Sequence, residues 1–210
     1  MRTIARLSLP VIVLALLTAC GNRPFSELAS AQQEALDFAM AQLNKLKDMD
    51  VYSDEAKDVK ENMDDKLETL LEKQNEAAQA CIGTEVDTEA TGDTGVTVDG
   101  NFQVTDVTEG SDPTLTLKSS AEVADASIVS KLAFIGYDGS EPLLPLSSYA
   151  FYDSETNTLQ FSFQCNSDDP EFAKRLGRIT KIVITADREL YQKQKNQQRE
   201  RKEELMRRYF

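Results

Sequence analysis

The amino-acid sequence predicts an α+β protein, and two residue patterns along the chain carry that prediction. Residues 26–80 contain neither Gly nor Pro, are rich in Ala, Leu, Glu, Gln and Lys, and repeat apolar residues at three- and four-residue steps. Residues 84–186 are rich in Thr, Val and Gly, and apolar and polar residues alternate there. The first pattern is typical of helices and the second of strands. We expect four consecutive parts: a leader at 1–19, a helical part at 20–80, a β domain at 81–186 and a charged helical arm at 187–210.

Apolar residues in the first helical part form two stripes: Leu36, Ala39, Leu43 and Leu46, then Ala56, Val59, Met63, Leu67, Leu70, Ala77 and Cys81. Between the stripes, Ser53 can accept a hydrogen bond from a free amide of a new helix, while Lys45 and Lys47 suit the last turn of the preceding helix. We therefore predict an N-terminal helical hairpin with its corner near Asp50. One continuous helix remains an alternative; it would be about 80 Å long and would need another chain to cover its stripe.

The β domain contains six runs with strand periodicity, separated by turn residues: 102–107, 114–123, 128–137, 149–152, 158–165 and 178–186. In the clearest run, Leu159, Phe161 and Phe163 share one face with Cys165, and polar residues occupy the other face. Six or seven short strands in about 100 residues are typical of an antiparallel β-sandwich, and an immunoglobulin-like layout is one option. The chain contains no Trp for the core of such a domain.

The C-terminal arm carries charge along its length and apolar residues only at its tip. No apolar residue occurs between Gln192 and Glu204, so this stretch has no apolar face for a core. We predict a solvated, projecting helix supported by charge pairs four residues apart: Arg199 with Glu203, Glu203 with Arg207, and Glu204 with Arg208. The residues predicted to bind a partner are those of the apolar tip: Leu205, Met206, Tyr209 and Phe210.

The leader has a short apolar core that ends at a cysteine. Arg2 and Arg6 precede a run from Leu7 to Leu17 that is apolar except for one Ser and one Pro, and Cys20 follows. A membrane-spanning helix takes about 20 apolar residues, so this run is too short to span a bilayer. A basic start, an apolar middle and small residues at the end are typical of a secretory signal.

Leu17-Thr18-Ala19-Cys20 resembles the lipobox of bacterial lipoproteins. The resemblance implies that the Cys20 thiol is acylated, that residues 1–19 are removed and that the new amino terminus is acylated too. Several acyl chains give stable attachment, so a lipid bilayer is the expected partner of Cys20. Gly21 and Asn22 follow without the aspartate that retains enterobacterial lipoproteins in the inner membrane, which implies an outer-membrane lipoprotein facing the periplasm. The alternative is an ordinary cleaved signal, or a spanning helix, with an incidental cysteine.

Lipidation of Cys20 would leave two cysteines, Cys81 and Cys165. Export places them in an oxidising compartment, where thiols pair. A Cys81–Cys165 disulfide would close a loop of about 85 residues and contribute about 4.5 kcal/mol in the chain-entropy model. It would attach the end of the helical part to the β domain. The alternative is a pair of buried free thiols.

Charge is distributed unevenly along the chain. The net charge is -13, but residues 174–210 carry twelve basic and five acidic residues, which leaves -20 for the remainder. We expect no nucleic-acid partner, because the average charge repels nucleic acid. The basic arm has three interpretations: it lies on the acidic stretch 27–76, it binds an anionic surface or an acidic envelope protein, or it associates head-to-tail with another copy.

The residue types argue against catalysis. The chain has no His and no Ser-x-x-Lys arrangement, so the common nucleophile and base pairs are absent. A carboxylate pair for glycoside hydrolysis stays open, although the chain has no Trp to stack on a sugar. Asp87–Glu89 and Asp153–Asn157 look like halves of a calcium loop, but the twelfth positions are Val98 and Gln164 instead of Glu. We expect no enzyme activity, no cofactor and no metal.

These observations predict a non-catalytic cell-envelope lipoprotein that acts by binding. The favoured function is an accessory or assembly protein that docks an envelope partner through the helical hairpin or the C-terminal arm. The alternative from another class is a periplasmic module whose β-sandwich binds a small molecule or a cation.

Overall fold

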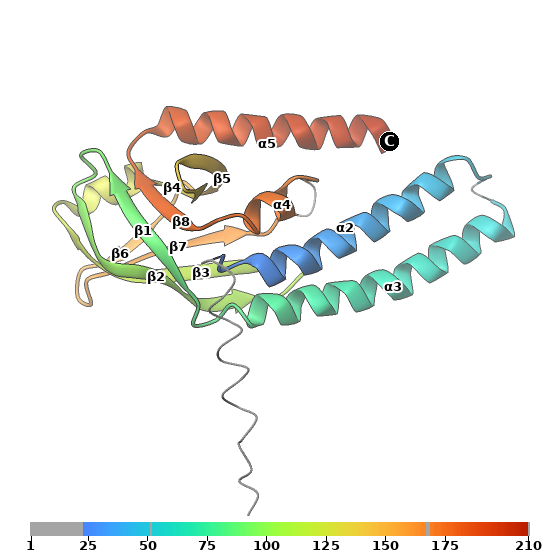
Figure 1. Cartoon of the computed structure of the whole chain (residues 1–210), viewed down its shortest axis with the longest axis horizontal. Coiled ribbons are helices and arrows are strands. Elements are labelled where there is room, and N and C mark those ends of the chain that lie inside the picture. Colours follow the sequence, from blue (N-terminus) through green and yellow to red (C-terminus); the bar gives the residue numbers. More distant parts are fainter. Residues whose placement is uncertain (1–22, 51, 167–168, 210) are drawn as a thin grey trace, which may run out of the picture.

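The computed structural model describes residues 23–50, 52–166 and 169–209 (Figure 1). Cys20 and Phe210 therefore lie outside the described residues. Helices and strands both contribute large parts of the fold, which confirms the α+β prediction. The elements in chain order are α2 (Ser26–Lys47), α3 (Asp54–Gln79), β1 (Glu85–Thr91), β2 (Val96–Thr108), β3 (Thr114–Val123), the 3-10 helix η1 (Ala126–Lys131), β4 (Ala133–Asp138), β5 (Glu141–Ser147), β6 (Phe151–Asp153), β7 (Thr158–Gln164), α4 (Phe172–Leu176), β8 (Lys181–Thr185) and α5 (Arg188–Tyr209).

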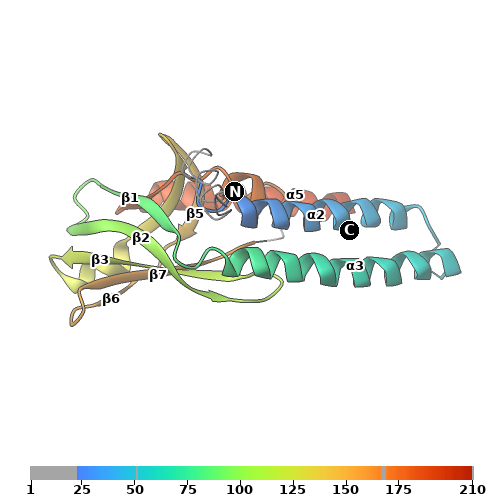
Figure 2. The same cartoon turned by 60° about the horizontal axis from the view of Figure 1, so that its bottom comes forward.

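The eight strands form one mixed sheet in the order β5-β4-β8-β1-β2-β3-β7-β6. Neighbouring strands are antiparallel except β1 and β8, which pair in parallel with Asp87 opposite Lys181. The sheet curls like half of a barrel, so that β5 approaches β7 (Figure 2). The predicted antiparallel β-sandwich, immunoglobulin-like or not, is not confirmed. A single sheet that curls this far encloses a core on its own concave side, so no second sheet is needed.

Side chains from the concave face of the sheet build most of the core. Phe102, Phe134 and Phe161 are fully or almost fully buried there. The rings of Phe134 and Phe161 stack with centroids 4.3 Å apart, and Phe102 meets Phe161 edge-on at 5.0 Å. The alternation predicted for residues 158–165 is confirmed, since Leu159, Phe161 and Phe163 are buried while Ser162 and Gln164 are exposed. Burial of these aromatic rings supplies the main apolar stabilisation of the body.

Three segments of the β domain differ from the sequence prediction. The predicted strand at 128–137 begins instead as η1, because Asp125 caps this short helix through the backbone N–H of Ser127. Strands β1 and β5 were not predicted. β1 is rich in acidic residues and Thr, and β5 contains Pro142 and Pro145. Proline is tolerated in β5 because that strand lies at the edge of the sheet.

Two helices occupy the first helical part, and they lie side by side in both views (Figures 1 and 2). α2 ends at Lys47 and α3 begins at Asp54. The predicted cap is confirmed: the Ser53 hydroxyl accepts a hydrogen bond of 3.1 Å from the Ala56 amide. None of the described helices is long and apolar enough to cross a membrane.

The beginning of α2 and the short helix α4 fill the open side of the curled sheet. Phe25, which precedes α2, is fully buried, and its ring meets Phe163 of β7 edge-on at 5.7 Å. Phe172 and Leu176 of α4 are buried in the same core cluster. The body of the protein is therefore the curled sheet together with these two helix segments, and the rest of α2 and α3 continues beyond it (Figure 1).

Candidate functional site

The structure brings Cys81 and Cys165 into the same buried cluster. Cys81 follows α3 and Cys165 follows β7, and both side chains belong to the main core. The Cys81 thiol donates a hydrogen bond of 3.4 Å to the backbone oxygen of Ala77. The helical part and the sheet thus meet at these two residues. The disulfide between them stays a prediction.

As thiols, both cysteines would be poor nucleophiles at neutral pH. Burial, with a smaller contribution from the charge of Glu27, raises the pKa of Cys81 to about 11. Burial also raises the pKa of Cys165 strongly, and the nearby Cys81 raises it further. Because the reactive form is the thiolate, this pair is suited to a structural role in the core and not to thiol chemistry.

The C-terminal helix α5 lies along the body and does not project freely (Figure 1). Near its start, Tyr191 packs on Ile135 of β4. Further along, the Arg201 guanidinium donates hydrogen bonds of 3.2 and 2.9 Å to the two carboxylate oxygens of Asp169, whose side chain is fully buried. The prediction of a projecting arm is wrong as far as Arg201, because a buried ion pair fixes a helix that has no apolar face.

Beyond Arg201, the last two turns of α5 carry the predicted tip. Leu205 is partly buried, Met206 is 46% exposed, and Arg207 and Arg208 are exposed. Tyr209 is the last residue of the helix, and Phe210 lies outside the described residues. All three predicted charge pairs of α5 are confirmed, with nitrogen–oxygen distances of 3.8, 3.5 and 3.2 Å.

The parts of α2 and α3 that continue beyond the sheet form a second candidate surface, which we call the helical extension (residues 36–50 and 52–70). Only Ala56 and Leu70 are buried among its described residues. Two helices can cover only the seam between them, and a third layer is needed to bury a helix face completely. The apolar side chains that stay partly exposed are Leu36, Phe38, Ala39, Met40, Leu43, Leu46, Met49, Val59, Met63 and Leu67.

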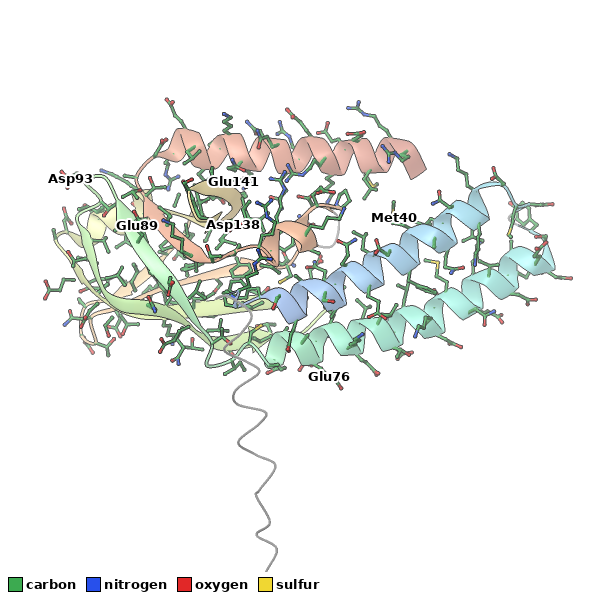
Figure 3. All side chains as sticks on the ribbon, viewed as in Figure 1. Met40, Glu76, Glu89, Asp93, Asp138 and Glu141 are labelled. Carbon is green, nitrogen blue, oxygen red and sulfur yellow. The ribbon has the colours of Figure 1, made fainter. Side chains whose placement is uncertain are left out.

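The charged groups of this region lie mostly on its surface. Lys73 donates a hydrogen bond to Glu34 across the two helices, and this bond holds the pKa of Glu34 below its usual range. Residues 36–70 contain ten acidic and five basic residues. Figure 3 places Met40 on the side of α2 that faces α5, and Glu76 on the opposite side of α3. The helical extension therefore presents a partly covered apolar seam in an acidic surround.

Open grooves are the main concave features on the surface of the described residues. One of about 520 Å³ lies between the β1–β2 turn and β3 and includes Asp93 and Glu122. Another of about 610 Å³ lies between α2 and α4 and includes Arg23 and Lys174. Among the described residues, no group of three or more His, Cys, Asp or Glu side chains is placed to hold a metal ion.

The half-loop at Asp153–Asn157 is built as a turn. The Asp153 carboxylate accepts hydrogen bonds from the Thr156 hydroxyl at 2.8 Å and the Glu155 amide at 2.9 Å, which hold the pKa of Asp153 below its usual range. Asn157 has a φ of 52°, a left-handed conformation that Asn tolerates in turns. The turn interpretation of these residues explains their acidic composition without a cation.

Comparison with known proteins finds no match: no family model matches the chain, and no curated protein or solved structure is significantly similar to it.

No local pattern in the sequence predicts the ion pair that docks α5. Asp169 precedes Pro170 in a stretch that is typical of a turn, and Arg201 is one of many cations in a polar helix. Only the fold brings them together, 32 residues apart in the chain. Sequence patterns also do not single out Gln32, which is 2% exposed and whose side-chain amide has no hydrogen-bond partner among the described residues.

Proposed function

We propose that this protein is a non-catalytic, lipid-anchored protein of the cell envelope that docks a partner there as an accessory or assembly protein. Cys20 provides the attachment, and the helical hairpin of residues 20–80 provides the docking surface. The observation that carries this proposal is the helical extension, whose apolar seam stays partly exposed outside the folded body. Exposed apolar surface of this kind, rimmed by charged residues, is typical of protein-binding sites.

The short connection between Cys20 and the body restricts where docking takes place. Phe25 is fully buried in the core, and only five residue steps separate it from Cys20. An extended chain of that length reaches at most about 17 Å. An acylated Cys20 would therefore hold the body against the bilayer surface. α2 has 22 residues and is about 33 Å long, so the helical extension would meet partners close to the same membrane.

Site-specific photo-crosslinking in envelopes tests the docking surface. A photoreactive residue replaces Leu67 in the helical extension, and a matched control replaces Lys118, which is exposed on β3. We expect one discrete, larger product from position 67 and none from position 118. Equal labelling from both positions, or no product from position 67, would contradict docking through the helical extension.

Replacement of Cys20 by Ser tests the attachment. We expect an unprocessed precursor that lacks the lipid mass, measured by intact-protein mass spectrometry of the membrane fraction. A correctly cleaved, membrane-bound Cys20→Ser product would remove the basis for the envelope location. Because this result does not depend on the crosslinking result, the two parts of the proposal can fail separately.

A further inference from the structure

The tip of α5 and the helical extension are chemically complementary. The tip combines apolar Leu205 and Met206 with two exposed cations, Arg207 and Arg208, which pair with Glu203 and Glu204 within the helix. The whole of α5 carries eight basic and four acidic residues, so the helix that ends in this tip is basic. The helical extension combines a partly exposed apolar seam with an excess of five negative charges over residues 36–70. Apolar contact gives such an interface its affinity, and opposite charges select the partner and speed the encounter.

The tip is held ready for binding by its own fold. The two hydrogen bonds between Arg201 and Asp169 fix α5 two turns before its end. The helix continues through Tyr209, so the tip does not have to be ordered when it binds. Ordering flexible residues reduces affinity, and a tip already fixed as a helix avoids most of that loss.

The tip cannot cover the far part of the helical extension of its own chain. Figure 1 shows α5 ending beside the middle of α2, short of the end where α2 passes into α3. The docking of Arg201 on Asp169 fixes that position. The α5 helix of the same chain therefore leaves the far part of the seam uncovered, and a tip that covered it would belong to another copy.

We propose that the partner that covers the helical extension is a second copy of this chain, whose α5 tip docks on it head-to-tail. This inference rests on the proposed function, because anchoring through Cys20 would confine both copies to one membrane surface and raise their effective concentration. The two contacting surfaces differ, so a pair of joined copies still has one free tip and one free helical extension to which further copies can add. Such a contact builds rows or closed rings rather than two-fold dimers.

Charge reversal with mixing tests this arrangement in the full-length lipidated protein. The tip variant is Arg207→Glu with Arg208→Glu. The surface variant is Asp64→Lys with Glu68→Lys, two exposed positions one helical turn apart on α3. Energy transfer between donor- and acceptor-labelled copies is measured in neutral phosphatidylcholine vesicles at low protein density. A matched control, Lys118→Glu with Glu122→Lys, reverses exposed charges on β3.

We expect the wild-type and control proteins to associate, and each of the two test variants alone to lose at least about tenfold in affinity, because like charges then oppose each other. A mixture of the tip and surface variants should recover to within about twofold of wild type, since each junction is again complementary. Any one of three results would overturn the proposal: energy transfer at the random level for wild type, unchanged association of the tip variant alone, or no recovery in the mixture.

The crosslinking at position 67 separates this inference from the proposed function. A product that contains a different protein, together with monomeric wild type in vesicles, would leave docking intact and overturn the second copy as partner. No product from position 67 and no energy transfer would overturn both. A product with the mass of two copies, together with recovery in the mixture, would support both.

Discussion

The curled sheet buries its apolar side chains far more completely than the helical extension does. In the sheet, Phe102, Phe134 and Leu159 are fully buried and contacted from several elements. In the helical extension, only Ala56 and Leu70 are buried among the described residues. A curled sheet closed by helices surrounds its core, whereas two helices leave both outer sides of their seam open to water.

Under the proposed function, this difference makes the sheet the main source of stability and the helical extension the binding surface. Apolar area removed from water stabilises the body by about 25 cal/mol per Å². The helical extension buries less apolar area per residue, so it gains less of this stabilisation. We therefore expect it to open locally before the sheet unfolds. Binding surfaces are drawn from such regions, because exposed apolar area is what a partner can still bury.

The largest expected effect concerns the link between the two regions. If Cys81 and Cys165 are paired, their double replacement by Ala should lower the free energy of unfolding by up to about 4.5 kcal/mol, because the unfolded chain regains the freedom of a loop of about 85 residues. Urea unfolding measures the loss, and non-reducing peptide mapping identifies the linked peptides. Two thiols that can be alkylated in denaturant without a reductant would show that the pair is not bonded.

A core aromatic should matter almost as much. Phe161→Ala should cost about 4 kcal/mol, because it leaves a cavity between Phe102 and Phe134. The control is Phe151→Ala on β6, which is 56% exposed and should change stability by less than about 0.5 kcal/mol. Equal urea midpoints for the two variants would show that the sheet does not hold the dominant core.

The pair that docks α5 should come next. Arg201→Met should destabilise the protein by about 3 kcal/mol, because it leaves the fully buried Asp169 carboxylate without its charged partner. The control is Arg207→Met, whose side chain is 80% exposed, with an expected effect of less than about 0.5 kcal/mol. Hydrogen exchange should also speed up along α5 in the first variant. Unchanged exchange there would mean that other contacts hold the helix.

Alkaline pH should lower the free energy of unfolding of the reduced protein, because its two thiols are buried. Burial raises the pKa of Cys81 from the ordinary 9.0 to about 11. Below pH 9 the thiol is protonated in both states, so its contribution to stability is complete; it is lost as pH rises from about 9 through about 11. Urea midpoints of the reduced protein, compared with the double Ala variant across that range, measure this loss. Parallel pH profiles would show that the thiols do not contribute.

The smallest effect is expected in the helical extension. Leu67→Ala should cost about 1 kcal/mol, because its side chain is only partly buried, whereas Leu159→Ala in the sheet should cost about 3 kcal/mol. Hydrogen exchange resolved by peptide distinguishes the two: Leu67→Ala should affect α2 and α3 alone, and Leu159→Ala the whole body. A global effect of Leu67→Ala would mean that the helical extension is part of one cooperative unit.

Local sequence patterns predict the structure correctly where neighbouring residues decide it. The strand predicted at 114–123 has the same bounds in the structure. The Ser53 cap and the charge pairs of α5 were also predicted, because caps and pairs four residues apart depend on adjacent turns of one helix.

Local sequence patterns do not predict which residues become neighbours only in the folded structure. β1 pairs with β8 across more than 90 residues, with Asp87 opposite Lys181, and no periodicity names a strand's partner. Because β1 is acidic and β5 contains two prolines, neither segment has the residue pattern that predicts a strand. The same limit applies to Arg201, whose partner Asp169 lies outside its helix.

The sequence by itself determined the α+β class, the faces of the helices and of the main strands, the polarised charge and the likeness of Leu17–Cys20 to a lipobox, because all of these are patterns within a few residues. Only the tertiary structure decided that the strands form one curled sheet, that α5 lies on the body, and that Cys81 and Cys165 share a core. These outcomes depend on which distant surfaces meet. That choice is made by the packing of the whole chain, since apolar burial has no direction and each face accepts many partners.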